Sequence, residues 1–541
     1  MKSLILLFHG IFLCTLADEK INVTIDNAVV QGYLHSYGQS FRGIPFAKAP
    51  IGKLRFAEAE FQELSEFTEA LSFGKSCVQD NGKTGSEDCL YINVFAPKNA
   101  TSTSKLPVYM YIFGGGFVGG DGNMNAAIYD NLVNSGPLIM VTANYRVGPF
   151  GFFSTRDTLA PGNEALTDWL VALQWVKRYI PYFGGDPSRI TIGGQSAGSE
   201  AVSALTLTPV ADGLFQQVIM ESGSAFGAAV MSYSEKTRDT SKQLAIKLNC
   251  ATEENWDSGS DFGPILNCMR GLTSQKISEA DSKLPSHRMK WALVQDKKYL
   301  TERLEYLALK RKPYPVLIGN VHDEWTGWEH NMIVNHLNSS HNTPSVLNTD
   351  LAQSYEISYW ANRVQILQAA QNKYVNNQGW SSDDHIDWEA RRVQLWSEMI
   401  FIGPTFLDAK YFAYTKSNVW LYSFDWLSPN ASPEITIPQL RGVPHAYELQ
   451  YIFSDKCSGF TCAAEDNQLR VYFSRAWRNF IVTGNPTPQN SGLPFRWQTM
   501  DSSNRYLSFL PQPSMKTLFH PDSLFWVCVA PQLDGYKPPF C

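Results

Sequence analysis

The 541-residue sequence lacks, after Ala17, any apolar run long enough to cross a membrane. A spanning helix needs about 20 mostly apolar residues, and no later segment approaches that length. Residues 536–541 at the C-terminus contain neither an endoplasmic-reticulum retention signal nor a hydrophobic anchor tail. We therefore expect no membrane span and no retention in that compartment.

An excess of positive charge is also absent. The chain has 45 Lys and Arg residues against 51 Asp and Glu residues, a formal net charge of −6. A protein whose main partner is nucleic acid needs a basic surface, so this composition argues against that class. We find no internal repeat, no low-complexity tract and no linker-like stretch. The sequence thus favours one enlarged domain over residues 18–541.

Cysteine is scarce, with nine residues, and the first of them, Cys14, lies in a distinctive N-terminus. Lys2 precedes an apolar run over residues 4–13, and small residues come before Asp18. This order is typical of a secretory signal peptide, here residues 1–17; the alternative is a buried N-terminal strand. Cleavage would leave eight cysteines, an even number that suits an oxidising compartment, so we expect a secreted, extracellular protein. Four glycosylation sequons agree with this route: Asn22, Asn99, Asn338 and Asn430.

Short apolar strands alternate with helical stretches through most of the chain. The helical pattern is clearest over residues 164–179, where apolar residues recur at helical spacing. The predicted strands are residues 28–33, 108–112, 138–141, 189–192, 218–220, 316–318 and 419–424. This alternation predicts an α/β fold whose central, mostly parallel sheet carries helices on both faces. In such folds the ligand site lies at the C-terminal ends of the strands.

One pentapeptide offers a candidate nucleophile. Residues 194–198 read Gly-Gln-Ser-Ala-Gly and follow the predicted strand 189–192 directly. In a Gly-x-Ser-x-Gly turn between strand and helix, the flanking glycines avoid collisions with neighbouring backbone, and the serine hydroxyl projects above the sheet. We predict Ser196 as the nucleophile; a chance match of common residues is the alternative.

A serine hydroxyl needs a base within hydrogen-bond reach and an acid that orients the base. In this fold the expected chain order is nucleophile, acid, base. His445, in a loop framed by Gly442 and Pro444 after a late strand, is the candidate base, and His322 is its rival. The candidate acids, Asp323 and Glu324, are adjacent and point differently, so spacing leaves the choice between them open.

A run of three glycines, residues 114–116, follows the predicted strand 108–112. Backbone without side chains can approach a substrate closely and donate N–H groups to a developing oxyanion. We predict Gly115, Gly116 and Ala197 as the oxyanion hole. The alternative is a mobile surface turn.

The chain resembles the type-B carboxylesterases, the α/β-hydrolase branch that includes the cholinesterases. The resemblance covers nearly the whole chain after residue 17. It rests on the elbow at Ser196 and on residues 41–47, 87–94, 114–117, 144–149 and 183–187. The family implies an α/β-hydrolase fold, Ser196 as nucleophile, Glu324 as acid and His445 as base. It places the oxyanion donors at Gly115, Gly116 and Ala197, and it implies neither cofactor nor metal.

The resemblance also implies structural pairs. It joins Cys77 to Cys89 and Cys250 to Cys268, and it pairs the charges of Arg42 with Glu87 and of Arg146 with Asp168. Cys457–Cys462 and Cys528–Cys541 are suggested by proximity alone, and a bridge between two chains is the alternative for Cys541. The sequence predicts no oligomeric state.

Departures from the cholinesterase pattern concern the substrate. The loop between Cys77 and Cys89 has no tryptophan to face a quaternary ammonium, and Gln195 is neutral where those enzymes carry glutamate. We therefore expect a small-molecule ester substrate without a positive head group. Gly-Gln-Ser-Ala-Gly also resembles invertebrate juvenile-hormone esterases, although Trp169 replaces their usual glutamine. Phe113 and Trp325 are further departures, and Trp325 is expected to narrow the pocket or shift the acid's loop.

The sequence thus predicts a secreted serine hydrolase that cleaves neutral or hydrophobic carboxylic esters through an acyl-enzyme intermediate. A lipase-like or juvenile-hormone-type esterase is the alternative within this class. From a different class, the fold also hosts non-catalytic adhesion or binding proteins. These proteins have typically lost members of the triad, whereas all three positions are present here.

Overall fold

The structure is a computed structural model that describes residues 18–124, 128–227, 233–285, 290–335, 342–354, 357, 360–376, 385–432 and 440–541. The predicted signal peptide and the sequon at Asn338 lie outside the described residues.

A large twisted sheet forms the centre of the molecule. Its central strands are mostly buried, because apolar side chains on both of their faces are covered by helices. The strands are β1 Glu19–Ile25, β2 Ala28–Leu34, β3 Gln39–Pro45, β4 Phe67–Glu69, β5 Tyr91–Ala96, β6 Leu106–Ile112, β7 Ile139–Ala143, β8 Gly185–Gln195, β9 Gln217–Glu221, β10 Val316–Val321, β11 Val419–Phe424, β12 Tyr506–Phe509 and β13 Ser514–Lys516.

The strand order is β1-β2-β3-β5-β7-β6-β8-β9-β10-β11-β12-β13, with β4 beside β2. From β7 to β12 every neighbouring pair is parallel, whereas β1–β3 and β5 add antiparallel strands at one edge and β13 adds one at the other. The prediction of a mostly parallel sheet is confirmed. The parallel order also brings the C-terminal ends of β6, β8, β10 and β11 to one edge.

Helices connect the parallel strands and cover the sheet. They are α1 Pro149–Phe152, α2 Glu164–Tyr179, α3 Ala197–Leu207, α5 Tyr233–Lys247, α6 Glu253–Ser258, α7 Gly263–Arg270, α8 Ser274–Ser282, α9 Leu304–Lys310, α10 Thr326–Asn335, α11 Pro344–Ala352, α13 Arg363–Tyr374, α14 His385–Trp396, α15 Gly403–Tyr414, α16 Leu449–Phe453, α17 Ala464–Thr483 and α18 Ala530–Leu533.

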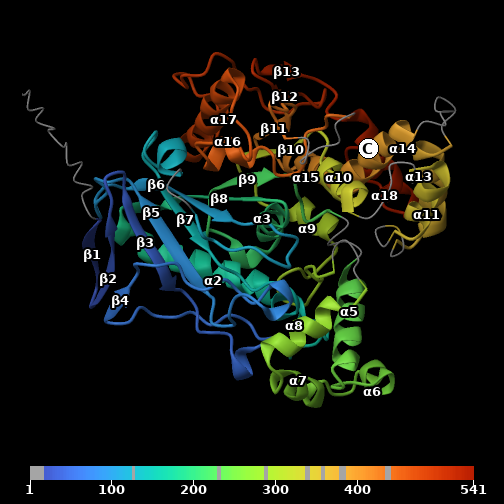
Figure 1. Ribbon diagram of the computed structural model, residues 1–541, viewed down its shortest axis with the longest axis horizontal. Coiled ribbons are helices and arrows are strands. Elements are labelled where there is room, and N and C mark those ends of the chain that lie inside the picture. Colours follow the sequence, from blue (N-terminus) through green and yellow to red (C-terminus); the bar gives the residue numbers. More distant parts are fainter. Residues whose placement is uncertain are drawn as a thin grey trace, which may run out of the picture.

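The helices form layers around the sheet (Figure 1). On one face α2 packs against α3, and on the other α16 and α17 pack against the helical turn Tyr129–Val133. Helices α11, α13 and α14 gather beyond the end of the sheet that is distant from β1 and contribute to a second hydrophobic cluster. Phe401 and Trp325 belong to this second cluster, whereas Val443 and Tyr447 belong to the main core. The loop of His445 therefore lies where the two clusters meet.

Of the two predicted ion pairs, one is present and the other is not. Arg146 and Asp168 are both buried and form a pair with an Nη2–Oδ1 distance of 2.7 Å. Glu87, however, does not pair with Arg42: both of its carboxylate oxygens accept from Arg55, at 2.6 Å each. Arg42 instead donates through Nη2 to the Leu71 carbonyl at 2.7 Å. The predicted Arg42–Glu87 pair is thus wrong.

The reason for the different pairing is the position of Arg55. Its Nη1 also donates to the carbonyl of Met269, in the last turn of helix α7, and to the carbonyl of Leu272, just after that helix. One guanidinium, with five donors in a rigid plane, thereby ties the Glu87 loop to a segment that follows Arg55 by more than two hundred residues. A pattern read from the local sequence contains no sign of that distant segment.

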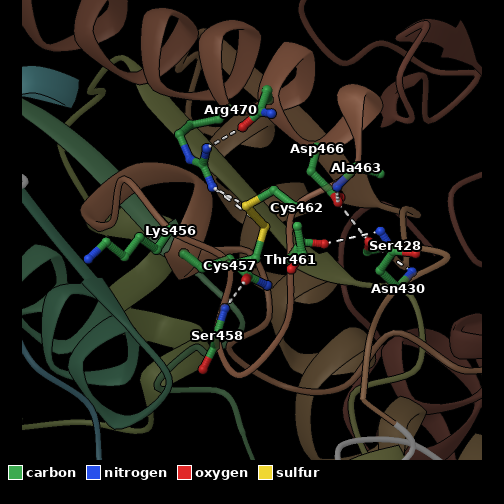
Figure 2. Close-up of a disulfide and its surroundings, with 12 residues drawn as sticks. Ser428, Asn430, Lys456, Cys457, Ser458, Thr461, Cys462, Ala463, Asp466 and Arg470 are labelled. Carbon is green, nitrogen blue, oxygen red and sulfur yellow. Dashed lines mark hydrogen bonds between the residues drawn. A yellow bond between two sulfur atoms is a disulfide. The ribbon is translucent and has the colours of Figure 1, made fainter.

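All eight cysteines after Cys14 are joined in four disulfides: Cys77–Cys89, Cys250–Cys268, Cys457–Cys462 and Cys528–Cys541. Cys541 thus bonds within its own chain. Figure 2 shows Cys457–Cys462, whose sulfur atoms lie 3.6 and 3.4 Å from Nη2 of Arg470 on α17. This short loop leads directly into α17, next to the segment that carries His445.

Candidate active site

Ser196 occupies the turn between β8 and α3 in a strained backbone conformation, with φ +59° and ψ −130°. Its N–H donates to the Glu221 carbonyl at 2.9 Å, and its own carbonyl accepts from the Glu200 N–H, so both ends of the turn are fixed. A Cβ at Gly194 would lie 2.4 Å from the Gly198 oxygen, and one at Gly198 would lie 2.1 Å from the Ile112 oxygen. Only glycine fits at either place, as the elbow pattern predicted.

Glu324 and His445 come together above the C-terminal ends of β10 and β11. The distance from Glu324 Oε2 to His445 Nδ1 is 2.5 Å, and the Glu324 side chain is fully buried. Its other oxygen, Oε1, accepts from the Asn320 amide and the Val321 N–H, both at 3.1 Å. The carboxylate is therefore held on both sides, and it fixes the ring of His445 through Nδ1.

Asp323 has a different task from Glu324. Its Oδ2 accepts from the Val443 N–H at 3.0 Å, and its Oδ1 lies 3.0 Å from Nδ1 of His322. This hydrogen bond raises the pKa of His322 to about 9, and the side chain of His322 is 53% exposed. His322 is thus a charged partner of Asp323, which ties the acid's loop to the loop of the base.

The glycine run after β6 is shaped by its backbone. Gly115 and Gly116 have φ values of +116° and +61°, and a Cβ at Gly115 would lie 2.2 Å from the Gly119 oxygen. A Cβ at Gly114 would come within 2.9 Å of the Ser196 Cβ, so this run lies directly beside the elbow. Among the described residues, the N–H groups of Gly115, Gly116 and Ala197 donate to no protein acceptor. They are available to a ligand.

Aromatic rings flank the candidate base. The ring of Phe401 lies 4.4 Å from that of His445, and the ring of Trp328 lies 5.0 Å from it, measured between centroids. Trp325 stacks behind Trp328 at 4.7 Å, while Trp328 itself is 38% exposed. Trp325 therefore supports the wall from behind, and its backbone N–H donates to Ser397 Oγ at 2.9 Å.

A set of buried carboxyl groups lies near Ser196 and Glu324. Burial raises the pKa of Glu200 and of Glu221 to about 8 each, and it raises the pKa of Glu448 well above its usual range. Glu200 and Glu221 are mostly protonated at neutral pH, because among the described residues no cation offsets the loss of water around them. The site therefore carries less negative charge than its carboxyl count suggests.

Three features near the site were not foreseen from the sequence. Phe401 and Trp328 flank His445 although no motif marks them, and the Gln195 amide nitrogen lies 3.0 Å from Nε2 of His445. The position of Trp328 four residues after Glu324, at helical spacing, was the one available signal. Phe401 comes from a segment that only tertiary packing brings near.

Other features expected from the sequence have these positions. Asn22, Asn99 and Asn430 are exposed on the surface. Phe113 stacks on Tyr145 at 4.2 Å, and Trp169 is buried at 5.2 Å from the same ring. Within the described ranges no three His, Cys, Asp or Glu side chains are grouped to hold a metal ion, and no helix is long and apolar enough to cross a bilayer.

The chain is similar to known proteins over most of its length. The sequence profile of the Carboxylesterase family matches residues 19–526. Human carboxylesterase 5A is 31% identical over 522 residues, 91% of this chain and 85% of its own. The medium-chain fatty acyl-CoA hydrolase precursor of Anas platyrhynchos is 29% identical over 527 residues, 91% of this chain and 88% of its own.

Solved structures show the same fold. The carboxylesterase EST55 of Geobacillus stearothermophilus superposes with a TM-score of 0.77 at 24% identity, over 93% of this chain and 99% of its own. A PNB esterase superposes with a TM-score of 0.75 at 26% identity, over 94% and 99%. The chain belongs to the carboxylesterase family of α/β-hydrolases, and its reaction is the hydrolysis of carboxylic esters.

Proposed function

We propose that Ser196, Glu324 and His445 form the catalytic triad of a secreted serine esterase that acts on neutral or hydrophobic esters. The observation that carries this proposal is the 2.5 Å contact between Glu324 and His445 beside the Ser196 elbow. Glu324, as a carboxylate, accepts a hydrogen bond from Nδ1–H, so Nε2 of His445 is unprotonated and can act as the base.

The reaction proceeds in two halves. As the Ser196 Oγ forms a bond to the ester carbonyl carbon, its proton passes to Nε2 of His445. The carbonyl oxygen becomes an oxyanion, which the N–H groups of Gly115, Gly116 and Ala197 receive. The intermediate collapses, the C–O bond breaks, and His445 gives its proton to the leaving alcohol.

In the second half water attacks the acyl-enzyme. His445 takes a proton from the water as the new C–O bond forms, and the same N–H groups hold the second oxyanion. Collapse of this intermediate returns the proton to Ser196 Oγ and releases the carboxylic acid. Every proton taken up by His445 is released again within the cycle.

Labelling with a fluorophosphonate tests the nucleophile. The reagent forms a P–O bond with an activated serine and expels fluoride, so wild-type protein should be labelled and Ser196→Ala should not. Ser199→Ala is the matched control: Ser199 lies one turn along α3, and its Oγ donates to the Gly223 carbonyl at 2.6 Å. Equal labelling of Ser196→Ala and wild type would overturn the assignment of Ser196.

The aromatic wall supports a neutral, apolar substrate. Trp328 and Phe401 border His445, where a leaving alcohol or an acyl chain must lie, and the neutral Gln195 and the tryptophan-free loop between Cys77 and Cys89 offer no site for a cation. Each buried methylene contributes about 0.8 kcal/mol, or roughly fourfold in kcat/KM. We expect kcat/KM for p-nitrophenyl esters to rise from acetate to hexanoate.

Trp328→Ala should flatten that series, because the longer chains lose their apolar partner while acetate loses little. Tyr306→Ala, which removes an exposed aromatic ring on α9, serves as the control. Acetylcholine should be hydrolysed more slowly than its uncharged carbon analogue, 3,3-dimethylbutyl acetate. A faster reaction with acetylcholine would contradict the proposed substrate class.

Secretion rests on the N-terminal pattern and on cysteine chemistry. All eight cysteines after Cys14 are paired, as an oxidising compartment favours, and the sequons at Asn22, Asn99 and Asn430 are exposed. Protein recovered from the medium of expressing eukaryotic cells should begin at Asp18 and lose mass on treatment with an N-glycosidase. Retention inside the cells with residues 1–17 attached would contradict it.

A further inference from the structure

Gln195 contacts His445, the proposed base for the adjacent Ser196. It is the last residue of β8 and is 4% exposed, and its amide Nε2 lies 3.0 Å from Nε2 of His445. The other amide atom, Oε1, is directed to the glycine run: a Cβ added at Gly114 would lie 3.1 Å from it. The amide thus lies between the candidate oxyanion hole and the base.

The chemistry of His445 decides which group donates. Its Nδ1 faces the Glu324 carboxylate at 2.5 Å, and an ionised carboxylate only accepts, so the ring proton is on Nδ1. Nε2 then carries a lone pair and can only accept. The donor in the contact is therefore the Gln195 NH₂ group, an arrangement that also fits the position of Oε1 above Gly114.

An imidazole nitrogen has a single in-plane lone pair, so two donors compete for it. The hydroxyl of Ser196 needs this lone pair before it can lose its proton. Within the part of the chain that the structure describes, Ser196 Oγ makes no hydrogen bond to His445, and Gln195 holds the position. Once Nε2 gains a proton, the amide N–H and the ring N–H are both donors and must separate.

We propose that Gln195 is a positioning residue that occupies the lone pair of His445 in the free enzyme and releases it when Ser196 reacts. This inference rests on the proposed roles of Ser196 and His445. An interaction that exists in the free enzyme and is broken in the transition state lowers kcat/KM by its own free energy. For a neutral hydrogen bond this corresponds to about two- to tenfold in rate.

Gln195→Met tests the proposal, because methionine has a similar length and shape but no N–H. The second-order rate of fluorophosphonate labelling and kcat/KM for p-nitrophenyl acetate should both rise about two- to tenfold. A side chain with a merely structural role would leave these rates unchanged or lower them on removal, and either result would overturn the proposal. Gln217→Met is the matched control, since Gln217 begins the adjacent strand β9 and donates to Thr191 and Ile481 instead.

Gln195→Glu provides a second readout, the pH profile. A carboxylate cannot donate to the lone pair but does accept from the protonated ring, so the acidic limb of kcat/KM should move to higher pH by about one unit or more. The other groups facing His445 are Glu324 and the uncharged rings of Trp328 and Phe401, with the buried Glu221 and Glu448 nearby. All of these are unchanged in the variant. An acidic limb that stays in place would contradict the contact.

The variants also separate this inference from the proposed function. Should the wild-type protein neither react with the fluorophosphonate nor hydrolyse esters, the triad assignment fails. Should the wild type react while Gln195→Met is no faster, only the role of Gln195 fails. Where Gln195→Met does not fold, Gln195→Asn replaces it: the amide is kept but is one methylene too short to reach His445, so the same rise in rate is expected.

Discussion

Adjacent residues with the same chemistry have separate tasks at this site. Asp323 and Glu324 are both carboxylates after β10, yet only Glu324 contacts Nδ1 of His445. Asp323 faces the opposite side, where it accepts from the Val443 N–H and pairs with His322. Spacing along the chain cannot separate the two, because the direction of each side chain is set by the turn that follows the strand.

This division predicts unequal losses on substitution. Glu324→Gln keeps the size of the side chain but removes the charge that orients and stabilises the ring, so kcat should fall by about 10³- to 10⁴-fold. Asp323→Asn loosens the loop of His445 without touching the ring and should cost about tenfold or less. Steady-state hydrolysis of p-nitrophenyl acetate measures both.

The two histidines that the sequence offered as the base, His322 and His445, also differ in their roles. His445→Ala should abolish measurable turnover, whereas His322→Ala removes only the partner of Asp323 and should retain most of the activity. If His322→Ala were inactive and His445→Ala active, the assignment of the base would be wrong.

At the scale of elements, the sequence predicted individual helices and strands better than it predicted contacts between distant segments. Helix α2 has the predicted bounds, and β11 does too, because each is a complete apolar pattern between clear ends. Strand β8 runs from Gly185 to Gln195, well beyond the predicted residues 189–192. Its polar start and glycine-rich end lack the apolar signal, but ladder hydrogen bonds to β6 and β9 extend it.

The residues of the site also fall into those recognisable from local sequence and those that depend on tertiary packing. Ser196, Glu324 and His445 lie in local turn patterns, and their order along the chain was recognisable. The ring of Phe401 and the Arg55–Glu87 pair depend on segments that meet only through packing. No local pattern in the sequence specifies such tertiary contacts. For this reason Glu87 was assigned to Arg42 instead of Arg55.

Asp466 at the start of α17 holds several elements around the loop of His445. Its buried carboxylate accepts from Trp426, Ser428 and Tyr451 side chains and from the Ala463 N–H, at 2.7 to 2.8 Å (Figure 2 shows Ser428 and Ala463). Burial alone would raise the pKa of Asp466, but these hydrogen bonds outweigh it and lower the pKa. The carboxylate therefore favours the folded state above its unfolded pKa, near 3.9, and this contribution is lost as pH falls.

Asp466→Asn should destabilise the protein and disturb the base's loop. An amide can accept through only one atom, so at least one buried donor loses its partner, at a cost of about 1–3 kcal/mol. We expect a lower apparent Tm at pH 7 and a smaller difference from wild type at pH 3, measured by circular dichroism. Asp455→Asn, in the exposed bend after α16, is the control and should change little at pH 7. An unchanged Tm in Asp466→Asn would contradict the anchoring role.

At the scale of the whole molecule, the fold buries carboxyl groups that would be ionised if they were exposed to water. Glu221 ends β9, fully buried, and accepts from Trp477 Nε1 at 2.9 Å. Glu448, also buried, lies near Glu221, and burial raises the pKa of Glu448 well above its usual range. The fold places these groups where strand ends and the loop of His445 converge, so their protonation links stability to pH.

Glu221→Gln should therefore stabilise the protein increasingly toward alkaline pH. Burial raises the pKa of Glu221 from 4.5 to about 8, so between these values the folded chain holds a proton that the unfolded chain has lost. The free energy of unfolding of the wild type must then fall as pH rises through this window. Glutamine removes the titration and still offers an oxygen to Trp477. The difference in apparent Tm between variant and wild type should grow from pH 5 to pH 8 and level off above, while Glu279→Gln on the exposed side of α8 should leave the pH profile unchanged. A difference that is constant with pH would mean that Glu221 is ionised in the folded protein, and the protonated cluster near the triad would not exist.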